Sequence, residues 1–235
     1  MKKIAAIDIG SNAVRMLICY VIQSENQDIF QKNSYLRLPL RLGEDSFRDG
    51  IISEKKINKL SEALITFKYM MKVHNVDAYQ VYATSALRES KNSLHVISEV
   101  EKTSGLKISL IDGLKEAKII SIGNPLSKLE FNKTYLYVDV GGGSTEYSII
   151  RRGIDKKSKS FKIGTVRLLN NTIDPSTINA IDKWLTSNID HNDKVKLFAT
   201  GGNINKIQTM TGTKTGKPIS YLSVKDLLNN LQAYS

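Results

Sequence analysis

The sequence predicts an α/β protein whose chain forms two similar halves facing a shared cleft. Apolar runs with the composition of strands alternate with segments whose apolar residues recur at helical spacing. One pattern, an apolar run followed by an acid, glycine and small polar residues, occurs at 4–12 and again at 135–147. A third glycine turn ends the apolar run in 197–203. One such turn is ordinarily only a hairpin, but three at strand ends indicate loops that handle phosphate.

The first half reads as three consecutive strands followed by alternating helices and strands. Pro39 and Gly43 mark where the chain leaves the sheet, and Ser53 is expected to cap the first helix. Hydroxyl residues at 84–85, followed by an arginine, suit an anion site at a helix N-terminus. The expected strands are 4–9, 13–22, 28–37, 77–83 and 107–111, and the expected helices are 53–74, 84–103 and 113–122.

The second half repeats this pattern after a polar stretch, so the expected domains are 1–126 and 127–235. The lysine-rich segment 151–159 is interpreted as a solvated turn. The expected strands are 134–140, 145–151, 158–163 and 195–200. The expected helices are one from Asp174 or Ser176 to about 188, one starting at 204, and 221–232.

The stretch 135–147 combines two acids with a glycine turn. Asp139 lies at the tip of an apolar run, the glycines 141–143 follow, and Glu146 begins the next run. Because glycine has no Cβ, such a turn can adopt positive φ and bring its N–H groups close to an anion. An acid beside the turn is where a hydrated Mg²⁺ or an attacking water would be held.

The charge balance is strongly positive, with 34 Lys and Arg against 23 Asp and Glu, a net charge of +11. This excess favours association with polyanions such as nucleic acid, phospholipid heads or chains of phosphate. A lysine-rich, solvated surface explains it nearly as well. Because only 7% of residues are aromatic and no arginine–aromatic cluster occurs, a dedicated nucleic-acid reader is not expected.

Length and composition are typical of a globular protein. The 235 residues, 41% hydrophobic and 24% charged, suffice for one large or two small domains. No apolar run is long enough to span a bilayer, and the run after the N-terminus meets Asp8, so we expect no membrane association, no signal peptide and a cytoplasmic location. The single cysteine, Cys19, cannot form a disulfide within the chain.

Seven short blocks of residues occur in order along the chain. They are 8–12 (DIGSN), 41–44 (RLGE), 83–89 (ATSALRE) with Asn92, 113–117 (GLKEA), 139–146 (DVGGGSTE), 164–167 (GTVR) and 199–202 (ATGG). Any one block would be a weak signal, but the set extends over nearly the whole chain. Together the blocks resemble the exopolyphosphatase/guanosine pentaphosphate phosphatase (Ppx/GppA) family.

The resemblance implies two ribonuclease-H-like domains of the actin, hexokinase and Hsp70 superfamily. Each would be a mixed β-sheet flanked by helices, with the active site in the cleft between them. The implied reaction is Mg²⁺-dependent hydrolysis of the terminal phosphate of inorganic polyphosphate and, in some members, of guanosine pentaphosphate to the tetraphosphate. Because family members are often dimers, the resemblance leaves a homodimer open.

The resemblance also assigns roles by motif. Glu116 would be the general base for the attacking water, and Arg88 would neutralise the region of the scissile phosphate. Without the surrounding blocks, Glu116 would be read as a surface glutamate on a helix. The implied metal ligands are Asp139, Glu146 and Asp8. The implied phosphate loops are Asp8, Gly10, Ser11 and Asn12, then Gly141, Gly142, Gly143 and Ser144, then Gly201 and Gly202.

Three departures from the family pattern affect this assignment. Lys115 stands where the family has a second glutamate, and Asp112 stands where it has a serine, so the surroundings of Glu116 are expected to differ. The second domain also lacks the further helices and strand that complete the sheet in the family, which leaves an exposed sheet edge.

Two alternatives stay open. A polyphosphate or guanosine-phosphate sensor would bind in the cleft with weak turnover, and Lys115 and the shortened second domain favour it. An actin-like or sugar-kinase ATPase would need an adenosine pocket, for which the short segment after Gly202 gives little room.

Overall fold

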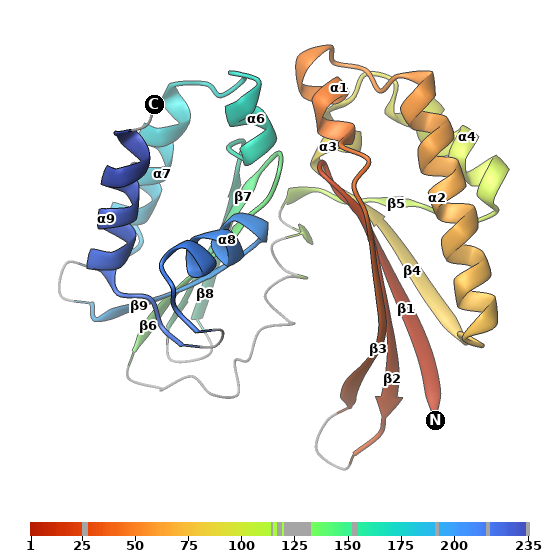
Figure 1. Ribbon diagram of the computed structural model, residues 1–235, viewed down its shortest axis with the longest axis horizontal. Helices are drawn as coiled ribbons and strands as arrows, with labels where there is room; N and C mark the ends of the chain where they lie inside the picture. The colour runs from red at the N-terminus through yellow and green to blue at the C-terminus, as the bar shows by residue number, and fades with distance from the viewer. Residues whose placement is uncertain are drawn as a thin grey trace.

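The computed structural model describes residues 1–24, 28–113, 115–116, 119, 133–151, 155–190, 193–214 and 217–233. In this part of the chain, two lobes stand side by side, and each is built on its own β-sheet (Figure 1).

The first sheet has five strands in the order β3-β2-β1-β4-β5 and begins as an antiparallel meander. β4 then pairs in parallel with β1, and β5 with β4, which requires crossover connections of the kind that helices provide. The strands are β1 (Lys2–Ile9), β2 (Val14–Ile22), β3 (Ile29–Leu38), β4 (Ala78–Ala83) and β5 (Ser109–Leu110).

The second sheet has four described strands in the order β8-β7-β6-β9, which repeats the arrangement β3-β2-β1-β4 of the first sheet. Its first three strands form an antiparallel meander, and β9 pairs in parallel with β6. The strands are β6 (Thr134–Val140), β7 (Thr145–Arg151), β8 (Asp155–Phe161) and β9 (Val195–Thr200). The prediction of two similar mixed-sheet halves is therefore confirmed. Among the described strands β9 lies at the edge of this sheet, and its Leu197 and Phe198 are exposed.

Two helices, α2 (Glu54–Val73) and α4 (Ser93–Ser104), pack against each other on one side of the first sheet (Figure 1). The apolar residues of α2 are buried at the spacing that predicted the helix. The other described helices are α1 (Leu42–Arg48), α3 (Ser85–Glu89), α6 (Thr165–Leu169), α7 (Ser176–Thr186), α8 (Gly202–Met210) and α9 (Tyr221–Gln232).

The main hydrophobic core lies in the first lobe, between its sheet and helices α1 to α4. Phe67, Leu60 and Met16 are among its fully buried or nearly fully buried side chains. One residue of the second lobe, Val166 of α6, belongs to the same cluster. This contact lies at the top of Figure 1, where α1 and α6 approach each other, so the two lobes are joined by apolar packing there.

The structure corrects two expectations for the connection between β3 and α2. The connection after Pro39, for which the sequence predicts no helix, contains α1, a helix too short to show apolar periodicity. Ser53 precedes α2 as expected, yet its hydroxyl donates to Asp45 Oδ2 at 2.5 Å and does not cap the helix. The expected boundary at 126/127, most of the expected helix 113–122 and the tip of the basic turn 151–159 lie outside the described residues.

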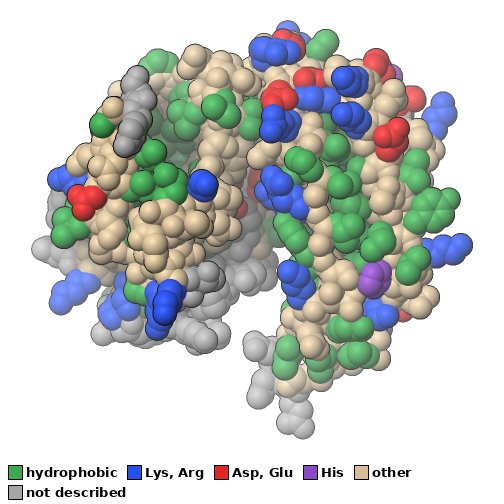
Figure 2. Space-filling model, viewed as in Figure 1, with side chains coloured by type: hydrophobic (Ala, Val, Ile, Leu, Met, Phe, Trp, Pro, Cys, Tyr) green, Lys and Arg blue, Asp and Glu red, His purple; other side chains and the backbone are tan. Residues whose placement is uncertain are grey.

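The surface gives no single site for a polyanion on the face seen in Figure 2. Lys and Arg side chains are spread over both lobes and are mixed with acids on the first lobe. Within the described residues, no helix combines the length and the apolar character needed to cross a membrane.

Candidate functional site

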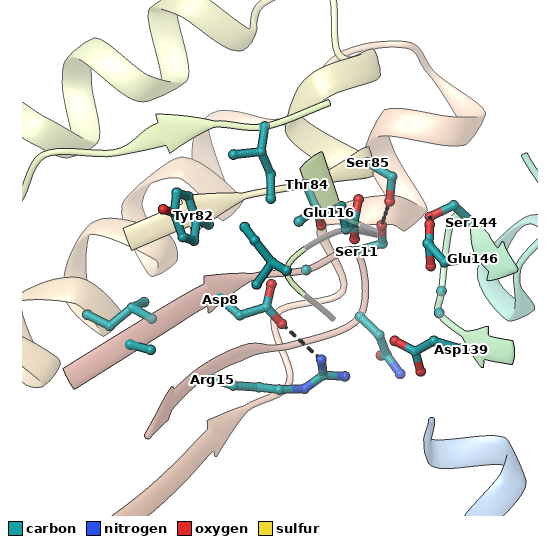
Figure 3. A pocket seen from close by; sticks show the side chains of 18 of the residues that line it. Asp8, Ser11, Arg15, Tyr82, Thr84, Ser85, Glu116, Asp139, Ser144 and Glu146 are labelled. Atoms are coloured by element: carbon teal, nitrogen blue, oxygen red, sulfur yellow. Dashed lines mark hydrogen bonds and ion pairs between the residues drawn. The ribbon is translucent and has the colours of Figure 1, made fainter. Parts of the chain in front are cut away.

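A cavity of about 410 Å³ lies between the two lobes and brings most of the predicted site residues together. Its size is in the range of small-ligand sites. The predicted residues that line it are Asp8, Gly10, Ser11, Asn12, Glu116, Asp139, Gly141, Gly142, Ser144 and Glu146. Figure 3 shows that the labelled acids and serines among them come from both lobes and lie around a common space. The sequence blocks thus converge although they are far apart in the chain.

The first loop follows β1 and is a tight turn in which Gly10 N donates to Ala13 O at 3.1 Å. Ser11 is buried in this turn, and its hydroxyl shares a hydrogen bond of 2.7 Å with Ser85 of α3 (Figure 3). Its carbonyl accepts from Gly43 N at 2.8 Å. The loop is therefore held in place by both α1 and α3.

The second loop has the same construction after β6, with Gly141 N donating to Ser144 O at 2.9 Å. The Ser144 hydroxyl donates to Glu146 Oε1 at 2.6 Å, and the Ser160 hydroxyl of β8 donates to the same oxygen at 2.9 Å. Two hydroxyl donors therefore fix the carboxylate of Glu146, which is 3% exposed.

Strand register places the acids at the ends of both hairpins. Asp8 is opposite Arg15, and Arg15 Nη1 donates to Asp8 Oδ2 at 2.9 Å. Asp139 is opposite Glu146 on one side and Thr200 of β9 on the other. The Thr200 hydroxyl donates to Asp139 Oδ1 at 2.6 Å, and the Tyr137 hydroxyl lies 2.8 Å from the Thr200 hydroxyl. Because Thr200 gives its proton to Asp139, Tyr137 is the donor to Thr200, and the two hydroxyls orient the carboxylate.

Glu116 faces the cavity from the segment after β5. Arg88 Nη1 donates to Glu116 Oε2 at 3.1 Å and to the carbonyl of Ile111 at 2.9 Å. The pKa of Glu116 is raised to about 7, chiefly by burial and further by the charges of Glu146 and Asp8, which together outweigh the lowering effect of Arg88. A carboxyl group with this pKa exchanges protons near neutrality, as a general base requires.

The two departures near Glu116 have structural explanations. Asp112 Oδ1 accepts from Lys115 N at 2.7 Å, so Asp112 acts as a cap for the helical turn that carries Glu116. The Lys115 side chain is exposed, and its Nζ lies over the Tyr82 ring at 5.4 Å from the centroid. Neither residue hydrogen bonds to the Glu116 carboxylate among the interactions of the described residues.

The cavity is rich in carboxylates. Asp8, Glu116, Asp139 and Glu146 line it, and Arg15 is the one cationic side chain among its described lining residues. Burial raises the pKa of Asp8 and Glu146, and the nearby charge of Asp139 adds to both effects. In the part of the chain that is described, no three acids, histidines or cysteines cluster closely enough to hold a metal alone.

Four predicted site residues do not line the cavity in the described part of the chain: Arg88, Gly143, Gly201 and Gly202. Arg88 is hydrogen bonded to the Glu116 carboxylate. Gly201 has φ of 109°, and a Cβ there would overlap the carbonyl oxygen of Val140, so only glycine fits this position. Gly202 begins α8, and a Cβ there would meet nothing within 4 Å.

Two glycines of the second loop also lie where the two lobes are in contact. None of Gly141, Gly142 and Gly143 has positive φ. A Cβ on Gly142 would lie 3.2 Å from Ser11 Cβ, and one on Gly143 would overlap the Phe47 ring and lie 2.6 Å from Ser85 Oγ. These two positions lack a side chain because the lobes touch there.

We expect Gly143→Ala to lower the free energy of unfolding by about 1–3 kcal/mol, because the added methyl group must displace Phe47 or Ser85. The matched control is Gly202→Ala, where the same methyl group meets no neighbour and the stability should be equal or slightly higher. Urea unfolding followed by circular dichroism measures both. Equal stability of the two variants would mean that the lobes are further apart than described.

Sequence reasoning missed the part of the cavity that is apolar. Leu17, Tyr35, Tyr82 and Ile119 line it alongside the acids. It also missed Ser160 and did not assign Thr200 to the site, whereas the hydroxyl residues 84–85 were expected at an anion site. Thr200 stands at a strand end, which could have indicated it, but Ser160 lies in a lysine-rich strand with no such signal.

Comparison with known proteins points to one family. Residues 21–218 match the Ppx/GppA phosphatase family. The chain is 32% identical over 200 residues to a bifunctional 3-dehydroquinate synthase/phosphatase of Fusobacterium nucleatum, covering 79% of this chain and 30% of that protein. It is 31% identical over 168 residues to a guanosine-5'-triphosphate,3'-diphosphate pyrophosphatase of Aeromonas hydrophila, covering 71% and 33%. It is 28% identical over 149 residues to a putative exopolyphosphatase of Haemophilus influenzae, covering 63% and 45%. The chain thus spans less than half the length of each.

Solved structures agree on the fold. An exopolyphosphatase from Cytophaga hutchinsonii superposes with a TM-score of 0.76 at 22% identity, over 89% of this chain and 70% of that one. The Aquifex aeolicus member of the Ppx/GppA family superposes with a TM-score of 0.73 at 21% identity, over 99% and 79%. At this identity the likeness concerns the fold alone, and it confirms the predicted architecture of two mixed sheets with flanking helices.

Proposed function

The chain belongs to the Ppx/GppA phosphatase family, and on this premise we propose that it hydrolyses the terminal phosphate of inorganic polyphosphate with Glu116 as the general base. The division into domains 1–126 and 127–235 and a cytoplasmic location are part of the same proposal.

One observation carries the proposal: a carboxyl group with a pKa of about 7 faces a cavity between two glycine–hydroxyl turns. Hydrolysis of a phosphoanhydride needs an oriented water, a base to take its proton and groups that hold the phosphate chain. A base is most effective when its pKa is close to the pH at which it works. Glu116 meets this condition, whereas an ordinary exposed glutamate would be too weak a base at neutral pH.

The two loops are the proposed phosphate cradle. Residues 10–12 of the first loop and Gly141, Gly142 and Ser144 of the second line the cavity together with Glu116. Backbone N–H groups in such turns can bind phosphate oxygens. The hydroxyls of Ser11 and Ser144 are engaged with Ser85 and Glu146, so we assign them to holding the loops in shape. Arg15, half-exposed at the cavity edge, is the proposed contact for a more distant phosphate.

The acids of the cavity fit a divalent cation. Four carboxylates with a single lining arginine leave uncompensated negative charge, which a cation would relieve. Mg²⁺ is usually held by one or two carboxylates together with substrate phosphates and water, so a cluster of three protein ligands is not needed. Asp139 and Glu146, with Asp8 beside them, are the residues that would hold it. When bound, it would neutralise phosphate charge and favour ionisation of a nearby water.

A nucleoside polyphosphate is the second candidate substrate. The apolar part of the cavity, with Tyr35 and Tyr82, offers surfaces on which a purine base could stack. An inorganic chain would not use these surfaces. The name of the Aeromonas relative, a pyrophosphatase of a guanosine polyphosphate, is in keeping with this candidate.

The test is phosphate release by the purified 235-residue chain from long-chain polyphosphate and, separately, from guanosine pentaphosphate, with and without Mg²⁺. We expect release that requires the metal, and the faster substrate identifies the preference. Binding of polyphosphate without release would replace the enzyme with a sensor. Neither release nor binding would reject both readings for this chain.

A further inference from the structure

Arg167 of α6 is a buried cation that the site described above does not use. Its side chain is 8% exposed, although an isolated guanidinium is among the most costly groups to bury. Its Nε donates to the carbonyl of Gly143 at 2.6 Å, and its Nη2 donates to the carboxylate of Glu89. Its guanidinium carbon lies 4.0 Å from the centroid of the Phe47 ring, which is a cation–π contact.

These three partners belong to different parts of the fold. Gly143 lies in the second loop, between β6 and β7, in the same lobe as Arg167. Glu89 ends α3 and Phe47 lies in α1, both in the other lobe. One guanidinium therefore connects the second loop to two helices of the first lobe, at the place where α1 and α6 meet (Figure 1).

The connection reaches both sides of the cavity. Glu89 directly follows Arg88, which is bonded to Glu116. Gly143 directly precedes Ser144, which is bonded to Glu146. A shift of either lobe relative to the other would therefore stretch the contacts of Arg167 and change the spacing between Glu116 and Glu146. The hydrogen bond between Arg167 and Glu89 joins two charged groups, which makes it stronger than a neutral hydrogen bond.

We propose that Arg167 is a positioning residue that holds the two lobes together around the cavity and keeps the second loop against the first lobe. Arg167 does not touch the cavity; it acts through Gly143 and Glu89. Its effect on catalysis rests on the proposed function, whereas its effect on the separation of the lobes does not.

The separation of the lobes can be measured by double electron–electron resonance between two spin labels. The labels are attached to cysteines at two exposed helix positions, Lys102→Cys on α4 and Lys183→Cys on α7, in a Cys19→Ala background. The variants are Arg167→Ala and, as a milder change that keeps the shape, Glu89→Gln. Lys162→Ala is the matched control, because Lys162 also pairs with Glu89 at 3.5 Å but is 74% exposed and contacts neither Gly143 nor Phe47 among the described interactions.

We expect a single narrow distance distribution for the wild type and for Lys162→Ala. Arg167→Ala should give a broader distribution with longer distances, and Glu89→Gln a smaller change in the same direction. A folded Arg167→Ala with the wild-type distribution would overturn the proposal. If that variant does not fold, an unchanged distribution in Glu89→Gln would overturn it instead.

Kinetics give a second readout where the wild type releases phosphate. If only a fraction of the variant molecules are closed, KM should rise by about tenfold or more, while kcat changes less because bound substrate closes the lobes. A tenfold or larger fall in kcat with unchanged KM would contradict a positioning role. A wild type without activity would reject the proposed function and leave the distance measurement as the test of Arg167.

Discussion

In Glu116→Gln we expect phosphate release to fall by about 10²–10⁴-fold, while the affinity for Mg²⁺-polyphosphate stays close to that of the wild type. Glutamine has the shape of glutamate and can still accept from Arg88, so the cavity keeps its form. It cannot take a proton from water near neutrality. The loss should therefore appear in kcat with KM unchanged, which is the pattern of a group that acts in the transition state.

Glu62→Gln is the matched control, since Glu62 is an exposed glutamate on α2 that does not line the cavity. It should retain wild-type rates. Phosphate release and equilibrium binding, measured on the same preparations, separate turnover from affinity. Wild-type turnover in Glu116→Gln would remove Glu116 from the mechanism, and the base would have to be sought among Asp8, Asp139 and Glu146.

The fold could be predicted from the sequence because most elements have a strong periodic signal. The repeat of an acid and a glycine turn after β1 and β6 indicated two similar halves, and the two sheets share one topology. The exception is α1, whose seven residues are too few to show a period of 3.6. It is nevertheless important, because Phe47 of α1 packs on both the second loop and Arg167.

The site could be predicted only in part, because motifs identify residues but not the directions of their side chains. Ten of the predicted residues do line one cavity. For Gly143 the sequence indicated approach to an anion, and it did not indicate the close contact with the other lobe that the structure shows. Contacts across the lobes depend on tertiary packing, and no local pattern encodes them. The hydroxyl donors of Glu146 and Asp139 were missed for the same reason.

Arg88 is the residue for which sequence and structure suggest different roles. The resemblance assigns it to the scissile phosphate, while the structure pairs it with Glu116 and with the carbonyl of Ile111. In the second role, Arg88 lowers the pKa of Glu116 from the higher value that burial alone would impose. The two roles predict different dependences of the rate on pH.

We expect Arg88→Met to shift the acidic limb of the pH–rate profile upward by about 1–2 pH units, because a charge-assisted hydrogen bond to the base is worth about 1.5–3 kcal/mol. A base works only when it is deprotonated, so the wild-type rate should fall as the pH drops through the pKa of Glu116, about 7 without ligands. Without the cation, that pKa rises, and the fall begins at higher pH. The rate should be strongly reduced at pH 7 and recover toward the wild-type value at pH 9.

The pH–rate profiles of wild type and variant are compared at one Mg²⁺ concentration, so that any effect of the metal on the pKa values of the carboxylates is the same in both. Arg48→Met is the matched control, because Arg48 is 66% exposed on α1 and pairs only with Asp49 among the described acids. It should leave the profile in place. If Arg88 instead contacts the scissile phosphate, Arg88→Met would lower the rate by one factor at every pH and leave the midpoint near the wild-type value. The position of the midpoint, rather than the size of the loss, therefore decides whether Arg88 acts on the base or on the substrate.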